Sequence, residues 1–186
     1  MRVLCGYEAT CVILWWLVPL LRYFMVKVKN DNFFMYKAIY EAYKTSDSGD
    51  VPVGCVIVKD GKIIARGHNT REKKQCACDH AEINAIKKAC KKVDSWRLTG
   101  CTMYVTLEPC PMCAGAIINS RLDKVVFGAH DMRYGALGGK INLLEGNLEY
   151  SPEVESGIKE KECADLLKTF FKKMRVKERT KSNPII

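Results

Sequence analysis

The spacing of apolar residues changes several times along the chain, and each change predicts a new element. In residues 32–45 apolar positions recur at helical spacing, which predicts an amphipathic helix. Residues 53–58 form a continuous apolar run, typical of a strand that is covered on both faces. The pair Asp60-Gly61 separates this run from apolar residues 63–65 and predicts a hairpin turn.

The alternation continues after a polar loop, which we expect at residues 70–79. The later elements are predicted to be a helix over 80–92, a strand over 102–107, a helix over 111–119 and a strand over 124–127. A glycine-punctuated stretch and a weakly patterned stretch, up to residue 157, precede a closing helix. The apolar face of that helix consists of Cys163, Leu166, Leu167, Phe170, Phe171 and Met174.

Strands that alternate with helices predict an α/β fold built as a three-layer α/β/α sandwich around a mixed sheet. Ligands of open α/β sheets bind beyond the carboxyl ends of the strands, so we expect a functional site there. Because no internal repeat or second set of elements is visible, residues 31–181 are expected to form a single domain.

The first 30 residues have a different character. Residues 11–21 are an unbroken apolar run, but a membrane-spanning helix needs about 20 such residues. The run resembles the apolar core of a signal peptide, yet no small-x-small cleavage site follows it. We expect residues 1–30 to be an extension outside the core domain, with the natural start near Met25 and no stable membrane association. A membrane-associating tail is the alternative.

Composition and charge indicate an anionic partner and a reducing compartment. Of the 186 residues, 48% are apolar and 27% charged, as in globular proteins, and the net charge is +9. Ten cysteines at irregular spacing favour buried thiols and a metal site in the cytoplasm over disulfides. The C-terminal basic residues fit either a phosphate-contacting surface or a solvated helix face: Lys168, Lys172, Lys173, Arg175, Lys177, Arg179 and Lys181.

Three metal-binding side chains are spaced as in a catalytic zinc site. Cys110 and Cys113 bracket two residues, so both thiolates can reach one ion from the first turn of a helix, and His80 can supply an imidazole. Pro111 suits the first position of that helix, whose N-terminus favours thiolates. Three protein ligands leave a fourth position for a water, which zinc acidifies toward neutral pH. Glu82 is then placed to move protons.

Two alternatives to a catalytic zinc site exist. Cys76 and Cys78 lie just before His80, so a closed structural site with four ligands is possible, although such a site would not need Glu82. A set of buried free thiols is the second alternative, because cysteine is often buried. The agreement of two separate motifs favours the open catalytic site.

His80-Ala81-Glu82 followed by Pro109-Cys110-Pro111-Met112-Cys113 is the known signature of zinc-dependent nucleobase deaminases. More specific features are Cys113-Ala114-Gly115-Ala116, a Phe-Gly-Ala-x-Asp segment ending at Asp131, and the apolar ending at residues 163–171. With these motifs, residues 31–175 resemble the bacterial tRNA-specific adenosine deaminases of the cytidine-deaminase-like superfamily. The resemblance implies a homodimer and conversion of the wobble adenosine of a tRNA anticodon to inosine. It also implies a five-stranded sheet, whose fifth strand would lie in residues 145–157.

The resemblance assigns roles to individual residues. The ligands of one zinc ion per subunit would be His80, Cys110 and Cys113. Glu82 would carry protons between the attacking water, the adenine ring and the leaving ammonia. The base-binding residues would be Asn69, Pro52, Val53, Ala81, Leu107 and Asp131. The contacts with the RNA backbone would come from Arg133, Lys172, Lys173 and Arg175.

The chain departs from the family around Asp131. His130 precedes it, where the family often has Arg or Lys, and Arg133-Tyr134 stands where the family often has Lys-Thr. Two other functions remain open. One is a deaminase of a free base or nucleoside, of guanine or cytosine type, against which the basic C-terminal stretch argues. The other is a non-catalytic, zinc-stabilised RNA-binding module, against which Glu82 argues.

Overall fold

The computed structural model describes residues 30–45 and 48–182. The chain divides after Asn30 into two units, and the fold below is that of the unit that begins at Asp31. The predicted apolar extension at residues 1–30 lies, apart from Asn30, outside the described residues. Within the described part, no helix combines the length and the hydropathy needed to cross a membrane.

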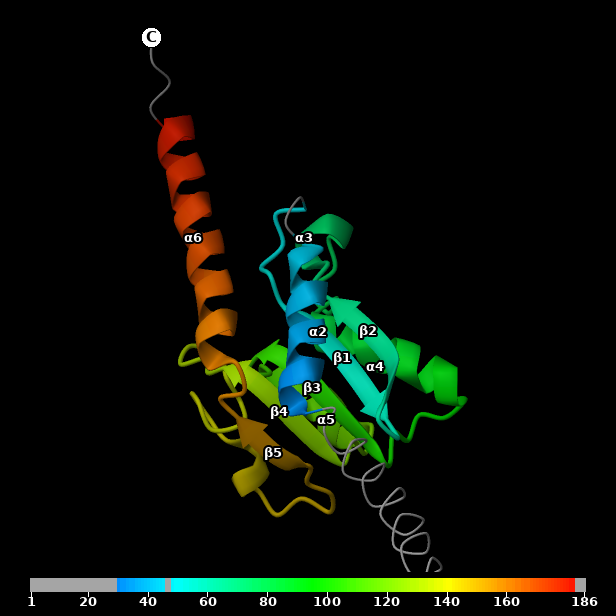
Figure 1. Cartoon of the computed structure of the whole chain (residues 1–186). Helices are drawn as coiled ribbons and strands as arrows, with labels where there is room; N and C mark the ends of the chain where they lie inside the picture. Colours follow the sequence, from blue (N-terminus) through cyan, green and yellow to red (C-terminus); the bar gives the residue numbers. More distant parts are fainter. Residues whose placement is uncertain (1–29, 46–47, 183–186) are drawn as a thin grey trace, which may run out of the picture. The chain divides into compact units, whose positions relative to one another are not determined.

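A mixed sheet of five strands forms the centre of this unit (Figure 1). The strands are β1 (Gly54–Lys59), β2 (Lys62–His68), β3 (Cys101–Leu107), β4 (Lys124–Ala129) and β5 (Glu153–Ser156), in the order β2-β1-β3-β4-β5. β1 pairs antiparallel with β2 and β3, whereas β3, β4 and β5 are parallel. The carboxyl ends of β3, β4 and β5 therefore lie at the same end of the sheet as the start of β1. The five strands predicted by the resemblance are confirmed.

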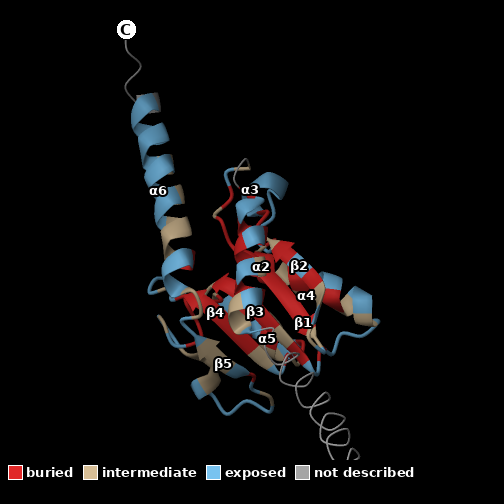
Figure 2. Cartoon of the chain, in the orientation of Figure 1, coloured by how far each residue is buried: buried red, intermediate tan, exposed pale blue. Residues whose placement is uncertain are grey.

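Helices cover both faces of the sheet, as predicted. On one face the core includes alanines of α4 (Ala81–Val93) and Ala114 and Ile117 of α5 (Pro111–Asn119). On the other face the core contains residues of α2 (Asp31–Tyr43) and Cys163 of α6 (Glu160–Ser182). Successive residues of β1 alternate between the two cores, which is the period of a strand buried on both faces. Figure 2 shows the buried sheet and the exposure of α6 along most of its length.

The predicted hairpin between β1 and β2 is confirmed. Its two turn residues, Asp60 and Gly61, have φ values of 50° and 69°, as a two-residue turn with positive φ at both positions requires. β2 continues past the apolar residues 63–65 to His68. Position 67 of this strand requires glycine, because a Cβ there would collide with the backbone of Ala81 and Ala85 in α4.

The polar loop predicted at residues 70–79 is wrong in part, because it contains the short helix α3 (Arg71–Lys74). The buried carboxylate of Asp50 holds the start of this helix. Its Oδ1 accepts from the backbone N–H of Glu72 at 2.6 Å, and its Oδ2 from that of Lys73 at 3.4 Å. A single helical turn also forms at η1 (Leu143–Glu145), in the weakly patterned stretch.

The contact between α2 and the start of β1 generates a stability prediction. A Cβ at Gly54 would overlap the backbone of Ala38 and Ala42 in α2, and neither backbone can move without unpacking the helix. Gly54→Ala should lower the free energy of unfolding by about 1–3 kcal/mol, as measured by denaturant titration. The control is Gly115→Ala in α5, where a Cβ meets no atom within 4 Å and should stabilise by about 0.5–1 kcal/mol. Equal stability of the two variants would contradict the proposed close contact.

Candidate active site

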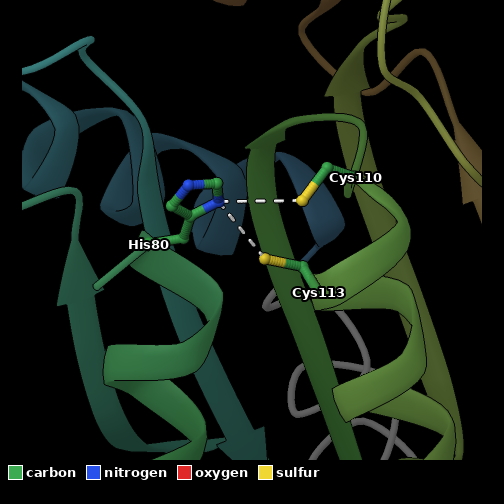
Figure 3. A group of neighbouring side chains, drawn as sticks. All are labelled: His80, Cys110 and Cys113. Atoms are coloured by element: carbon green, nitrogen blue, oxygen red, sulfur yellow. Dashed lines mark hydrogen bonds between the residues drawn. The ribbon is translucent and has the colours of Figure 1, made fainter. Parts of the chain in front are cut away.

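The first turns of two helices bring three metal-binding side chains together (Figure 3). His80 is the N-cap of α4 and Cys110 the N-cap of α5, and both have extended backbone conformations. Cys113 lies one turn into α5, where it is buried. Pro111 occupies the first helical position of α5, which suits its fixed φ. His80 therefore sits at the helix entry, where its side chain and that of Glu82 can serve one site.

The separations between the three side chains fit a tetrahedral zinc ion. His80 Nδ1 lies 3.7 Å from Cys110 Sγ and 3.6 Å from Cys113 Sγ. All three ligand atoms lie within 4.8 Å of one another. Zn–S bonds of about 2.3 Å and Zn–N bonds of about 2.0 Å at tetrahedral angles would separate sulfur from nitrogen by about 3.5 Å. The three side chains can thus hold one metal ion without rearrangement of the backbone.

In the absence of a metal ion, the pKa of only one of the three side chains, Cys110, is shifted in the direction that suits a cation. The hydrogen bond with Cys113, with help from His80, lowers the pKa of Cys110 to about 4. The hydrogen bond with Cys110 raises the pKa of His80. The hydrogen bond with Cys110, together with burial, raises the pKa of Cys113. A bound cation would reverse that last direction, because coordination deprotonates a thiol.

Glu82 lies in the first turn of α4 and is only 4% exposed. Burial raises the pKa of its carboxyl, and the negative charge of Cys110 raises it further. A carboxyl whose pKa is shifted upward can exchange protons closer to neutral pH than an ordinary glutamate. The buried carboxyl beside the three ligands is therefore suited to general acid–base work.

A cavity of about 760 Å³ opens onto this group at the carboxyl ends of β3 and β4. Its lining includes His80, Cys110 and Glu82. Most of the base-binding residues that the resemblance implies also line it: Val53, Asn69, Ala81, Leu107 and Asp131. Pro52 is buried and does not line the cavity.

The residues expected to contact the RNA backbone lie in two places. Arg133 lines the cavity. Lys172, Lys173 and Arg175 are exposed on α6 and do not line it. The adjacent Phe170 and Phe171 differ in position, because Phe171 lines the cavity and is 41% exposed, whereas Phe170 is half-buried and lies outside the lining.

Several lining residues were not predicted, among them Arg71 and Glu72 of α3, Met132, Tyr134, and Glu108 at the end of β3. Glu108 is fully buried and accepts hydrogen bonds from three backbone N–H groups. Its position directly before the Pro-Cys-x-x-Cys motif was visible in the sequence, but its partners lie far along the chain.

Cys76 and Cys78 do not take part in the metal-binding group. Both are exposed and free, and the one group of candidate ligands among the described residues contains only His80, Cys110 and Cys113. The geometry therefore favours an open site with three protein ligands over the closed four-ligand alternative.

Comparison with known proteins identifies the family. Residues 29–175 match the sequence model of the MafB19-like deaminases. The chain is 50% identical over 151 residues to the tRNA-specific adenosine deaminase of Bacillus subtilis (strain 168), a match that covers 81% of this chain and 94% of the relative. The chain belongs to the tRNA-specific adenosine deaminase family.

Solved structures agree with this family assignment. One from work on A-to-I editing by tRNA:A34 deaminases at the wobble position superposes with a TM-score of 0.69 at 38% identity, covering 73% of this chain and 99% of that one. A guanine deaminase from Nitrosomonas europaea has a TM-score of 0.66 at 24% identity, covering 75% and 83%. At that identity it shows only a shared fold, and a fold does not select a substrate. The fold predicted from the sequence is confirmed.

The geometry of the metal-binding group generates a prediction on metal content. We expect the full-length protein to bind one zinc ion per chain, and Cys110→Ser to lose most of it because a thiolate ligand is removed. The matched control is the double variant Cys76→Ser, Cys78→Ser, which removes two thiols without touching the three-ligand group. Elemental analysis after dialysis measures both. Loss of zinc from the double variant would instead support a structural site.

Proposed function

We propose that the chain is a hydrolytic, zinc-dependent deaminase that converts the wobble adenosine of a tRNA anticodon to inosine. The observation that carries the proposal is the buried Glu82 beside the His80, Cys110 and Cys113 group in a cavity. The relatives of the chain support the substrate, because they are tRNA-specific adenosine deaminases.

His80, Cys110 and Cys113 would hold the zinc ion, which when bound acidifies a water and polarises the reaction centre. Glu82 accepts a proton from the attacking water as the water oxygen bonds to C6 of adenine. It delivers this proton to the ring nitrogen, then accepts the remaining proton from the new C6 hydroxyl and passes it to the exocyclic nitrogen. The C6–N6 bond breaks, ammonia leaves, and the carbonyl of inosine remains. Water and adenosine are consumed, and no oxidant or reductant is required.

The fixed amide of Asn69 supports its role in holding the base. Its Nδ2 donates to the carbonyl of Val51 at 3.2 Å, and its Oδ1 accepts from the N–H of Arg71 at 3.3 Å. Each of these bonds uses half of the capacity of the atom, which leaves one donor and one acceptor for a ligand. Asn69 can thus orient its own loop and a base edge together. Apolar side chains of Val53 and Leu107 complete the wall.

Exposed apolar and aromatic side chains at the cavity support RNA as the substrate in preference to a free base. Met132, Tyr134 and Phe171 are 70%, 62% and 41% exposed, and all three line the cavity. The two aromatic rings, of Tyr134 and Phe171, are suited to stacking on unpaired nucleotides beside a base pocket. The target base must leave its stack to reach the pocket, and the unpaired bases of an anticodon loop make this step inexpensive.

We further infer a cytoplasmic homodimer with one zinc ion per subunit. The free cysteines of the described residues suit a reducing compartment, and tRNA is the partner that the names of the relatives indicate. The homodimer rests on the resemblance to the family. Sedimentation of the purified protein measures it directly.

The role of Glu82 generates a prediction on activity. Glu82→Gln keeps the size of the side chain but removes its ability to accept a proton. Deamination of an anticodon stem–loop should fall by about 10²–10⁴-fold, the usual contribution of a general acid–base group. Zinc content should stay at one per chain, because Glu82 is not a ligand. Ammonia release and metal analysis of the same sample provide the measurement, and near-normal turnover would exclude the mechanism.

The exposed basic residues of α6 generate a prediction on salt dependence. Replacing Lys172, Lys173 and Arg175 with Gln should weaken tRNA binding and flatten the plot of log K against log salt by up to about two units, at about 0.7 per phosphate contact. The control replaces Lys62, Lys91 and Lys92, which are also exposed. These lie at the β1–β2 turn and the end of α4, at the end of the sheet opposite the cavity.

Binding of both triple variants is measured over one salt series. An equal effect of the two would mean that net charge alone, and not a surface on α6, attracts the RNA.

A further inference from the structure

The carboxylate of Glu108 is enclosed by a loop that lies more than twenty residues further along the chain. Its Oε2 accepts from the backbone N–H of Asp131 at 3.0 Å. Its Oε1 accepts from the N–H of Leu137 at 3.0 Å and of Gly139 at 2.8 Å. The side chain is fully buried, and Nδ1 of His130 lies 3.5 Å from its Oε2. Three backbone amides thus hold this buried carboxylate.

Two glycines show how closely the loop surrounds this carboxylate. A Cβ at Gly135 or at Gly139 would collide with the carboxyl group of Glu108 and with the carbonyl oxygen of Asp131. The residues between them form no regular helix, and their strand pairing is limited to a bridge between Leu137 and Asn142. A carboxylate has about four acceptor positions and can satisfy three converging donors. Glu108 therefore adds three hydrogen bonds to the backbone bonds of this irregular loop, such as that from the N–H of Gly135 to the carbonyl of Asp131.

The loop anchored in this way carries one side of the cavity. Asp131, Met132, Arg133 and Tyr134 all line it. Asp131 also accepts from the N–H groups of Arg133 and Tyr134 at 2.9 and 3.1 Å, which fixes the turn that presents these side chains. The chain of contacts runs from Glu108 to the amide of Asp131, and from the carboxylate of Asp131 to the rest of the turn. At the other end of this chain of contacts, Glu108 lies two residues before the candidate ligand Cys110.

We propose that Glu108 is a positioning residue that holds the loop of residues 131–134 against the active site and thereby sets the affinity for the RNA substrate. This inference rests on the proposed function for its substrate, but the anchoring itself is independent of it. Glu108 touches no reacting atom in this scheme. It acts through the loop, so it should affect binding more than the chemical step.

Glu108→Gln tests the hydrogen bond from Asp131 separately from those of Leu137 and Gly139. The single amide oxygen can still serve Leu137 and Gly139, which share one acceptor, whereas the NH₂ group would face the N–H of Asp131 and cannot accept from it. The variant should thus release the turn at Asp131 and keep the rest of the loop. The matched control is Glu149→Gln, the same chemical change at an exposed carboxylate.

The first measurement is amide hydrogen exchange by NMR on the zinc-loaded, full-length protein. In Glu108→Gln the amide of Asp131 should exchange about tenfold faster or more, because a partly buried N–H has lost its acceptor. The amides of Leu137 and Gly139 should keep their protection, as should all three in Glu149→Gln. Unchanged exchange at Asp131 would overturn the proposed anchor.

The second measurement is steady-state deamination of an anticodon stem–loop. KM should rise about tenfold while kcat stays within about twofold, as expected when binding is lost and the chemical step is intact. A fall in kcat with unchanged KM would overturn the positioning role and place Glu108 in the chemistry. Zinc content should remain one per chain in both variants.

A second variant reaches the same contact from the loop side. Gly135→Ala pushes the loop away from the carboxylate without altering Glu108, and should raise KM in the same direction. It decides the question if Glu108→Gln is poorly folded. A wild-type protein that fails to deaminate the stem–loop would refute the proposed function, while the exchange data would still test the anchor.

Discussion

The close contact between helix α4 and strand β2 is the constraint on which the candidate site depends. Gly67 has no side chain, so the backbone of Ala81 and Ala85 can approach the strand directly. Ala89 continues the same small-residue face into the core. Larger side chains would lift the helix and move its first residues away from α5. Because His80 caps α4 and Cys110 caps α5, the distance between helix and sheet sets the distance between the candidate ligands.

Hydrogen bonds between the two cysteines, together with burial, shift the pKa values at this site in opposite directions. The deeply buried Glu82 and Cys113 have raised pKa values, whereas that of the less buried Cys110 is lowered by its hydrogen-bonding neighbours. One thiolate and one carboxyl that can hold a proton thus lie side by side. Their different environments separate the task of binding a cation from the task of carrying protons, although all these groups occupy the first turns of two helices.

The parts of the fold and site that could be predicted are those whose causes are local in sequence. The spacing of Cys110 and Cys113, the Asp60-Gly61 turn and the apolar runs of β1 and β3 each depend on residues a few positions apart. β5 was foreseen only through the resemblance, because this four-residue strand is exposed or half-buried throughout and has no buried face to produce a pattern.

Contacts between distant residues explain the features that were missed. The start of α3 is held by Asp50, 22 residues before Glu72, and the loop after β4 is held by Glu108, 23 to 31 residues before its donors. Nothing near Glu108 or Asp50 in the sequence marks these partners, since backbone N–H groups carry no residue identity. In the sequence, a buried carboxylate of this kind cannot be distinguished from an ordinary acidic residue.

Under the proposed function, the long helix α6 also constrains the size of the substrate. Phe171 lies at the cavity, and the basic residues that follow lie further along a rigid helix, each turn adding about 5 Å. Under the proposed function, an oligonucleotide that ends at the target base could not reach those charges. The proposed contacts on α6 would therefore favour longer strands, independently of the identity of the base.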